Sequence, residues 1–158
     1  MTANSHITWV VVADTTRCRI YEHKKNPEEL NLIKDLEHPQ NKLKDFDLTA
    51  DKPGRYKANS AGQGSYAAHG TYEQRTDPKE IKIADFARDI SKELDYGRNV
   101  HAYAKIIIIT PSHMSGLLFH HFNKHVKGLV THNIEKNVLH LNDQDLLKFI
   151  YNHTRYVS

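Results

Sequence analysis

The stretch ITWVVVA, residues 7–13, is a continuous apolar run dominated by β-branched side chains. Such a run predicts a strand that is buried on both faces of a sheet. A second run of the same kind, YAKIIIIT, covers residues 103–110. Because central strands of a helix-covered sheet need apolar side chains on both faces, we expect these two strands to lie side by side at the sheet centre.

Shorter signals predict the remaining elements. Apolar alternation between turn residues predicts two more strands, which form an antiparallel meander with the first run. Capping residues followed by apolar side chains at helical spacing predict three helices, the first starting with a capping box and ending near Gly97. The elements expected besides the two central strands are strands at 17–21, 30–36 and 129–136, and helices at 80–96, from 112 to before Gly128, and from Asn142 onward.

The predicted order of elements is βββ-α-β-α-β-α. Right-handed crossovers then place the strands in the order 3-2-1-4-5. This is a ribonuclease-H-like α/β arrangement, a mixed five-stranded sheet with a meander on one side. We expect a single domain over residues 1–158 that contains a long glycine-rich loop at about 38–76. Loops of this length are uncommon in compact domains and are usually functional or disordered, so a working site is expected there first.

Composition limits the possible functions. The formal charge of +3 over 158 residues is weakly basic and compatible with an anionic partner. The single cysteine, Cys18, excludes an internal disulfide and a multi-cysteine zinc site, and its place in a strand indicates packing rather than reactivity. No apolar run approaches the length of a membrane span, and no signal peptide is apparent, so we expect a cytoplasmic protein. No cofactor is predicted.

Asp14 follows the first strand, where nucleases of this fold place a metal-binding carboxylate. A metal-dependent hydrolase would need further carboxylates around the ions. The end of the fourth strand, Thr110-Pro111-Ser112-His113, has no acid, and Glu93 on the first helix would stand nearly alone. Because aspartate favours turns through its own side-chain hydrogen bonds, a turn role for Asp14 is the preferred interpretation.

His121 and His125 are four residues apart in one predicted helix, a spacing that suits two zinc ligands. Both fall within the apolar stripe of that helix, and no third ligand is marked. We therefore favour packed or partly exposed histidines and predict no metal site. The histidines expected at the surface are His113, His120 and His132.

The long loop holds the predicted binding residues. The segment from Asp51 to Arg55, DKPGR, is either a Pro-Gly turn or an anion site. Gly62-Gln63-Gly64 can present a glutamine amide on a backbone with little steric restriction, or it is a flexible tip without a role. The residues expected to bind a partner are Lys52, Arg55, Lys57, Gly62, Gln63 and Gly64.

From about residue 7 to residue 150 the chain resembles a bacterial family. The stretches that carry the resemblance are WVVVADTTRCRIYE at 9–22, DLEHP at 35–39, DKPGR at 51–55, DPKEIKIADFARDISKEL at 77–94 and TPSHMSGLL at 110–118. In their order they match the host attachment protein family, whose members are described as required for attachment to host cells. That family is also grouped with bacterial proteins similar to the class-1 peptide-chain release factors of archaea and eukaryotes.

The resemblance implies a sheet like that of the release-factor middle domain, which carries a Gly-Gly-Gln loop. Its counterpart here is Ala61-Gly62-Gln63, in which alanine replaces the first glycine. We therefore expect a non-catalytic or weakly catalytic module that binds the ribosome or RNA through residues 51–66. The alternatives are an attachment protein that contacts a protein partner, and a metal-dependent hydrolase that uses Asp14.

Overall fold

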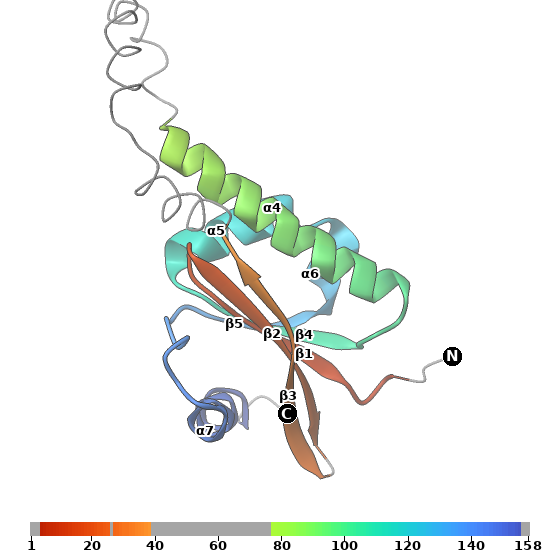
Figure 1. Ribbon diagram of the computed structural model, residues 1–158. Helices are drawn as coiled ribbons and strands as arrows, with labels where there is room; N and C mark the ends of the chain where they lie inside the picture. Colours follow the sequence, from red (N-terminus) through yellow and green to blue (C-terminus); the bar gives the residue numbers. More distant parts are fainter. Residues whose placement is uncertain (1–3, 26, 39–76, 156–158) are drawn as a thin grey trace, which may run out of the picture.

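The structure, a computed structural model, describes residues 4–25, 27–38 and 77–155 (Figure 1). These residues form a twisted sheet with helices on both of its faces. In chain order the elements are β1 (Thr8–Ala13), β2 (Arg17–Lys25), β3 (Glu28–Glu37), α4 (Pro78–Asn99), β4 (Lys105–Ile109), α5 (Ser112–His121), α6 (Lys124–Leu129), β5 (Val130–Ile134) and α7 (Asp143–Thr154).

The strand order is β3-β2-β1-β4-β5, which confirms the predicted 3-2-1-4-5 sheet. β2 pairs antiparallel with both β1 and β3, whereas β4 runs parallel to β1 and to β5. The two apolar runs are neighbours at the centre, with Val10 opposite Ile107. The fold is therefore the predicted ribonuclease-H-like α/β arrangement.

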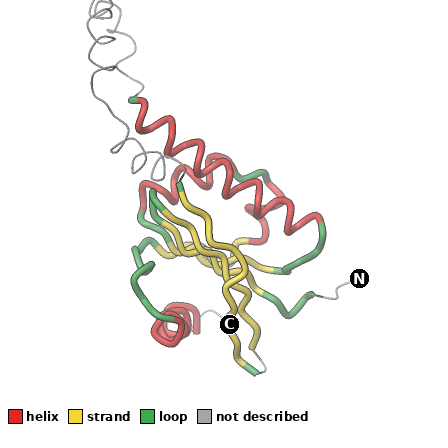
Figure 2. The backbone as a smooth tube through the Cα atoms, in the orientation of Figure 1, coloured by secondary structure: helices red, strands yellow, loops and turns green. Residues whose placement is uncertain are grey.

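The sheet separates two cores (Figure 2). α4, α5 and α6 cover one face, and α7 covers the other. Along β1 the side chains alternate, so that Trp9 and Val11 belong to the first core and Val10 and Val12 to the second. This alternation is the reason for the uninterrupted apolar run: each face of a central strand has its own helical layer to pack against.

Two predictions about element boundaries were wrong. The helix expected from residue 112 to before Gly128 is two helices, α5 and α6, because Asn123 adopts an extended backbone and its side chain accepts from Val126 N at 2.8 Å to cap α6. β2 and β3 also extend beyond the predicted 17–21 and 30–36. The hydrophilic residues next to the β2–β3 turn continue the antiparallel pairing up to Lys25 and Glu28, and His23 Nε2 lies 2.9 Å from a Glu28 carboxylate oxygen.

Gly97 does not end the first helix, as the sequence suggested, but lies inside it. α4 continues to Asn99, and a Cβ on Gly97 would lie only 2.5 Å from Trp9 Cη2. The indole of Trp9 also contacts the Tyr103 ring, with centroids 4.5 Å apart. Glycine is thus required here because helix and strand approach closely.

The described residues flanking the long loop lie at one end of the sheet. The last of them before the loop, His38, has its ring centroid 5.2 Å from that of Phe86, on the third turn of α4. The first residue after the loop, Asp77, caps α4 by accepting from Lys79 N at 2.9 Å. Because an α-helix rises 1.5 Å per residue, Asp77 and Phe86, which mark the two flanks, are separated by only about 14 Å along the helix axis. Among the described segments, no helix has the length and apolar character needed to span a bilayer.

Candidate functional site

The predicted binding residues lie outside the described part of the chain. They are Lys52, Arg55, Lys57, Gly62, Gln63 and Gly64, all within residues 39–76. The structure does describe the end of the sheet from which this segment departs. β3 runs in the same direction as β1, so Glu37 and Ala13 lie at the same end of the sheet. The carboxyl ends of the parallel strands also lie at this end, where open α/β sheets usually bind ligands.

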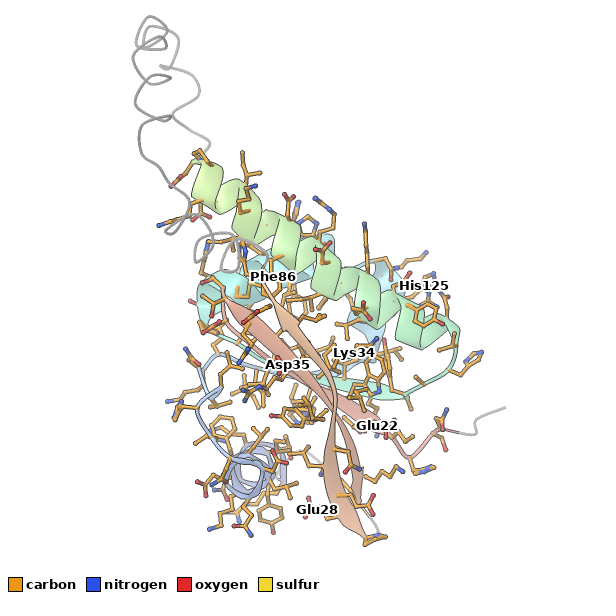
Figure 3. The ribbon with its side chains drawn as sticks, in the orientation of Figure 1. Glu22, Glu28, Lys34, Asp35, Phe86 and His125 are labelled. Carbon is orange, nitrogen blue, oxygen red and sulfur yellow. The ribbon has the colours of Figure 1, made fainter. Side chains whose placement is uncertain are left out.

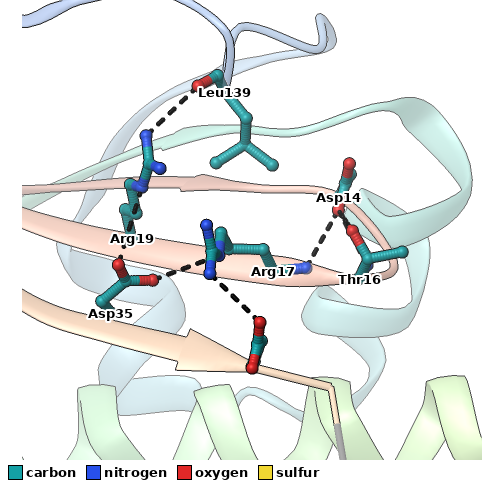
Figure 4. A network of polar contacts seen from close by, with 7 residues as sticks. Asp14, Thr16, Arg17, Arg19, Asp35 and Leu139 are labelled. Carbon is teal, nitrogen blue, oxygen red and sulfur yellow. Dashed lines mark hydrogen bonds and ion pairs between the residues drawn. The ribbon is translucent and has the colours of Figure 1, made fainter. Parts of the chain in front are cut away.

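A polar hollow of about 490 Å³, here called the loop-end hollow, opens at this end of the sheet. It is lined by Asp14, Thr16, Arg17, Arg19, Glu37, Asn137, Leu139 and His140. The Asp14 carboxylate accepts from Thr16 N at 2.7 Å, Thr16 Oγ1 at 2.7 Å and Arg17 N at 3.0 Å (Figure 4). Asp14 therefore holds the β1–β2 turn, as its preferred interpretation predicted.

Two arginines cross the loop-end hollow between β2, β3 and the segment before α7 (Figure 4). Arg17 lies 3.4 Å from Asp35 and 3.1 Å from Glu37, and Arg19 donates to Leu139 O at 3.2 Å. Asp35 also lies 3.9 Å from Arg19, so one carboxylate orients both guanidinium groups. Carboxylates balance the positive charges here. The network therefore joins β2 to β3 and does not form a free anion site.

The described residues offer no ligand set for the alternative function, a metal-dependent hydrolase. No group of three or more His, Cys, Asp or Glu side chains among them could hold a metal ion. Glu93, the other candidate carboxylate, lies on α4 at 3.2 Å from Nζ of Lys34 on β3; Figure 3 labels Lys34. Cys18 is fully buried, and burial followed by the nearby charge of Asp35 raises the pKa of its thiol, as expected for a packed cysteine.

The predicted pairing of His121 and His125 on one helix was wrong. His121 ends α5 and His125 lies in α6, on opposite sides of the break at Asn123. His121 is half-buried, and its Nε2 has no hydrogen-bond partner among the described residues. Burial, then the charges of His120 and Arg88, lower its pKa, so the ring is neutral at pH 7. The spacing of four residues therefore does not create a ligand pair.

A larger hollow of about 760 Å³ lies at the opposite end of the face that α7 covers. We call it the basic hollow. Figure 3 shows the direction along β3, with Asp35 toward the loop end and Glu28 near the other end. The basic side chains that line it are His6, His23, Lys24, Lys25, Lys105 and His132, and the acidic one is Glu29. Sequence reasoning missed this cluster because its members come from the segment before β1 and from β2, β4 and β5.

His132 departs from its predicted surface position. It is half-buried, its Nδ1 lies 2.9 Å from Thr131 Oγ1, and its Nε2 is buried without a partner in the described residues. Burial first, and the charge of Lys25 second, lower the pKa of His132. In β5, His132 lies beside Ile107 of β4, so its side chain is on the same face of the sheet as that of Ile107, the face that α7 covers.

Comparisons with known proteins identify the family of this chain and one solved structure that shares its fold. A family model described as "Protein required for attachment to host cells" matches residues 9–150, so the chain belongs to this family. An archaeal protein of known structure is similar over 96% of this chain and 35% of its own, with 12% identity and a TM-score of 0.52, which shows a shared fold. The crystal structure of an archaeal translation termination factor is similar over 96% of this chain and 39% of its own, with 9% identity and a TM-score of 0.48. No curated protein sequence matches the chain.

Proposed function

We propose that this member of the host attachment family is a cytoplasmic, non-catalytic or weakly catalytic module that binds RNA phosphates, on the ribosome or free, through residues 51–66. The observation that carries the proposal is the position of the described residues on either side of this segment. β3 ends and α4 begins at the end of the sheet that holds the carboxyl ends of the parallel strands, where ligands of open α/β sheets usually bind.

The sequence of the segment supplies the chemistry. Lys52, Arg55 and Lys57 place three cations within six residues, next to the single acid Asp51. Lysine and arginine supply most phosphate contacts of RNA-binding proteins, and such contacts give binding that weakens with salt. Gln63, flanked by glycines, adds an amide that can donate and accept hydrogen bonds on a backbone able to approach a partner closely.

The frame around the segment supports a binding role. In the loop-end hollow Arg17 pairs with carboxylates and Arg19 donates to a carbonyl. The Asp14 carboxylate accepts hydrogen bonds within the β1–β2 turn. These contacts hold the end of β3 and the β1–β2 turn in place. A rigid base reduces the conformational entropy that binding a partner costs.

Labelled single-stranded RNA tests the proposal by fluorescence anisotropy at low salt, with ribosome co-sedimentation in parallel. The triple variant Lys52→Gln, Arg55→Gln, Lys57→Gln should bind more weakly. Loss of three phosphate contacts should also flatten the plot of log K against log salt by about 2. The matched control is Lys92→Gln, Lys127→Gln, Lys148→Gln, which removes the same charge from exposed helical positions.

Three outcomes separate the possibilities. A salt slope that falls in the 52/55/57 variant and stays constant in the control supports the proposal. Equal losses in both variants would mean that net charge alone attracts RNA. Absence of RNA binding and of ribosome co-sedimentation in the unaltered protein would refute it.

The family description also supports a second function, contact with a protein partner during attachment to host cells. Such contact requires the protein to reach the cell surface. Protease treatment of intact cells tests this directly. Digestion of the protein under conditions that spare cytoplasmic markers would favour attachment, and complete protection would favour the RNA-binding proposal.

A further inference from the structure

We propose that the basic hollow binds a phosphate-bearing small molecule of about mononucleotide size. The hollow lies between the second half of α7 and the amino-terminal ends of β1 and β4, marked by Thr8 and Lys105. This is a second site, distinct from residues 51–66, and it is built from described side chains.

Uncompensated positive charge is the first argument. Lys24, Lys25 and Lys105 line the hollow, and none of the three has a carboxylate within 4.0 Å among the described residues. Glu28, the acid nearest His23, already lies 2.9 Å from that ring, which leaves Glu29 as the acidic lining residue. A concave surface with a net positive charge focuses its field into the cavity and concentrates anions there.

The loop-end hollow provides an internal comparison. Both hollows lie on the face that α7 covers, and both contain basic side chains. In the loop-end hollow Arg17 is paired with Asp35 and Glu37, so an incoming anion would have to displace carboxylates. In the basic hollow Glu29 is the one acidic lining residue, and no carboxylate of the described residues lies within 4.0 Å of the lysine amines.

The shape and the remaining lining define the ligand further. A volume of about 760 Å³ falls within the usual 300–1,000 Å³ of small-molecule sites. Ile107 and Ile150, which are 5% and 2% exposed, form an apolar floor beneath the lysines. Thr8, Thr131 and Thr154 also line the hollow. The hydroxyls of Thr131 and Thr154 donate to the carbonyls of Ile106 and Ile150, so Thr8 is the threonine that can donate to a phosphate or sugar oxygen. A cationic rim over an apolar floor suits a phosphate attached to a flat or apolar group.

His132 is a further polar side chain of the hollow. Burial first, and the charge of Lys25 second, disfavour protonation of its ring. A phosphate bound in the hollow would counteract the effect of Lys25 and favour the protonated, donating form of the ring. Its buried Nε2, which has no hydrogen-bond partner among the described residues, is the kind of polar atom that a bound ligand or water usually satisfies.

The basic hollow and the described residues that flank positions 39–76 lie at opposite ends of β1. The basic hollow begins at Thr8, and the loop leaves near the level of Ala13, the other end of β1. At about 3.3 Å per residue, that strand spans roughly 17–20 Å. Substitutions in one site should therefore leave contacts in the other intact.

Calorimetric titration of the full chain with adenosine 5′-monophosphate, inorganic phosphate and adenosine tests the proposal. We expect the monophosphate to bind, phosphate to compete with it, and adenosine to bind at least tenfold more weakly. In Lys25→Gln, Lys105→Gln, each lost charge-assisted contact should weaken binding about tenfold or more. Lys148→Gln is the control, since it removes an exposed charge from α7 outside the hollow.

Each outcome decides the question. Unchanged affinity in the Lys25/Lys105 double variant, or no binding of either phosphate compound at millimolar concentration, would overturn the proposal. The Lys52/Arg55/Lys57 triple variant should keep its affinity for the monophosphate. If that variant loses the affinity while the double variant keeps it, the ligand binds residues 51–66 and the basic hollow is not the site. Coincident urea unfolding curves for the variants and the unaltered protein establish that all are folded.

Discussion

Replacing Gly97 by alanine tests how closely α4 approaches β1. The added Cβ would lie 2.5 Å from Trp9 Cη2, 2.7 Å from Trp9 Cζ3 and 3.0 Å from Tyr103 Cε2. Carbon atoms pack at about 3.5–4.0 Å, so the indole would have to move by about 1 Å. Little room exists for that movement, because Trp9 is 4% exposed and the Tyr103 hydroxyl donates to Leu94 O at 2.6 Å.

Two effects of opposite sign set the magnitude. Overpacking of a core costs about 1–3 kcal/mol, and alanine is more favourable than glycine in a helix interior by about 0.8–1 kcal/mol. Because two rigid rings must yield, we expect a net loss of about 1–2 kcal/mol in the free energy of unfolding. Gly116→Ala is the matched control: nothing lies within 4 Å of its added Cβ, so α5 should gain about 0.5–1 kcal/mol.

Urea unfolding monitored by fluorescence measures both variants, since Trp9 is the only tryptophan and reports on the contact itself. The change should appear in the midpoint with the m-value unaltered. If Gly97→Ala is as stable as the unaltered protein while Gly116→Ala shows its gain, α4 does not approach β1 as closely as described, and the reasoning fails.

Three further predictions concern single groups. Asp14→Ala should lower the free energy of unfolding by about 2 kcal/mol, because three donors lose their acceptor; unchanged stability in urea would contradict the turn role. Burial lowers the pKa of His38, His121 and His132 below the ordinary 6.5, so the unfolded chain binds more protons, and stability should be lost as pH falls below about 6.5; a flat profile between pH 7 and 5 would refute this. The Cys18 thiol should resist thiol reagents until the protein unfolds, because it is fully buried with a raised pKa; rapid labelling of the native protein would show otherwise.

Local patterns were sufficient for most of the fold. The apolar runs at 7–13 and 103–110 identified the central strands, and the crossover rule then ordered the sheet correctly. Capping worked for the same reason, since Asp77 and Asn142 bond to backbone amides two or three residues away. The break at Asn123 was missed because apolar residues on both sides of it continue the helical spacing. The functional residues proposed at 51–66 stay a prediction.

Side-chain period and contacts within one turn of the chain were enough to identify the strands, α4 and α7, and the crossover rule then ordered the sheet. Only the tertiary structure decided that Gly97 must accommodate the Trp9 ring and that Lys25, Lys105 and His132 line one hollow. Those residues are distant along the chain. Their meeting depends on strand register and on the position of α7, and neither leaves a local signal in the residues themselves.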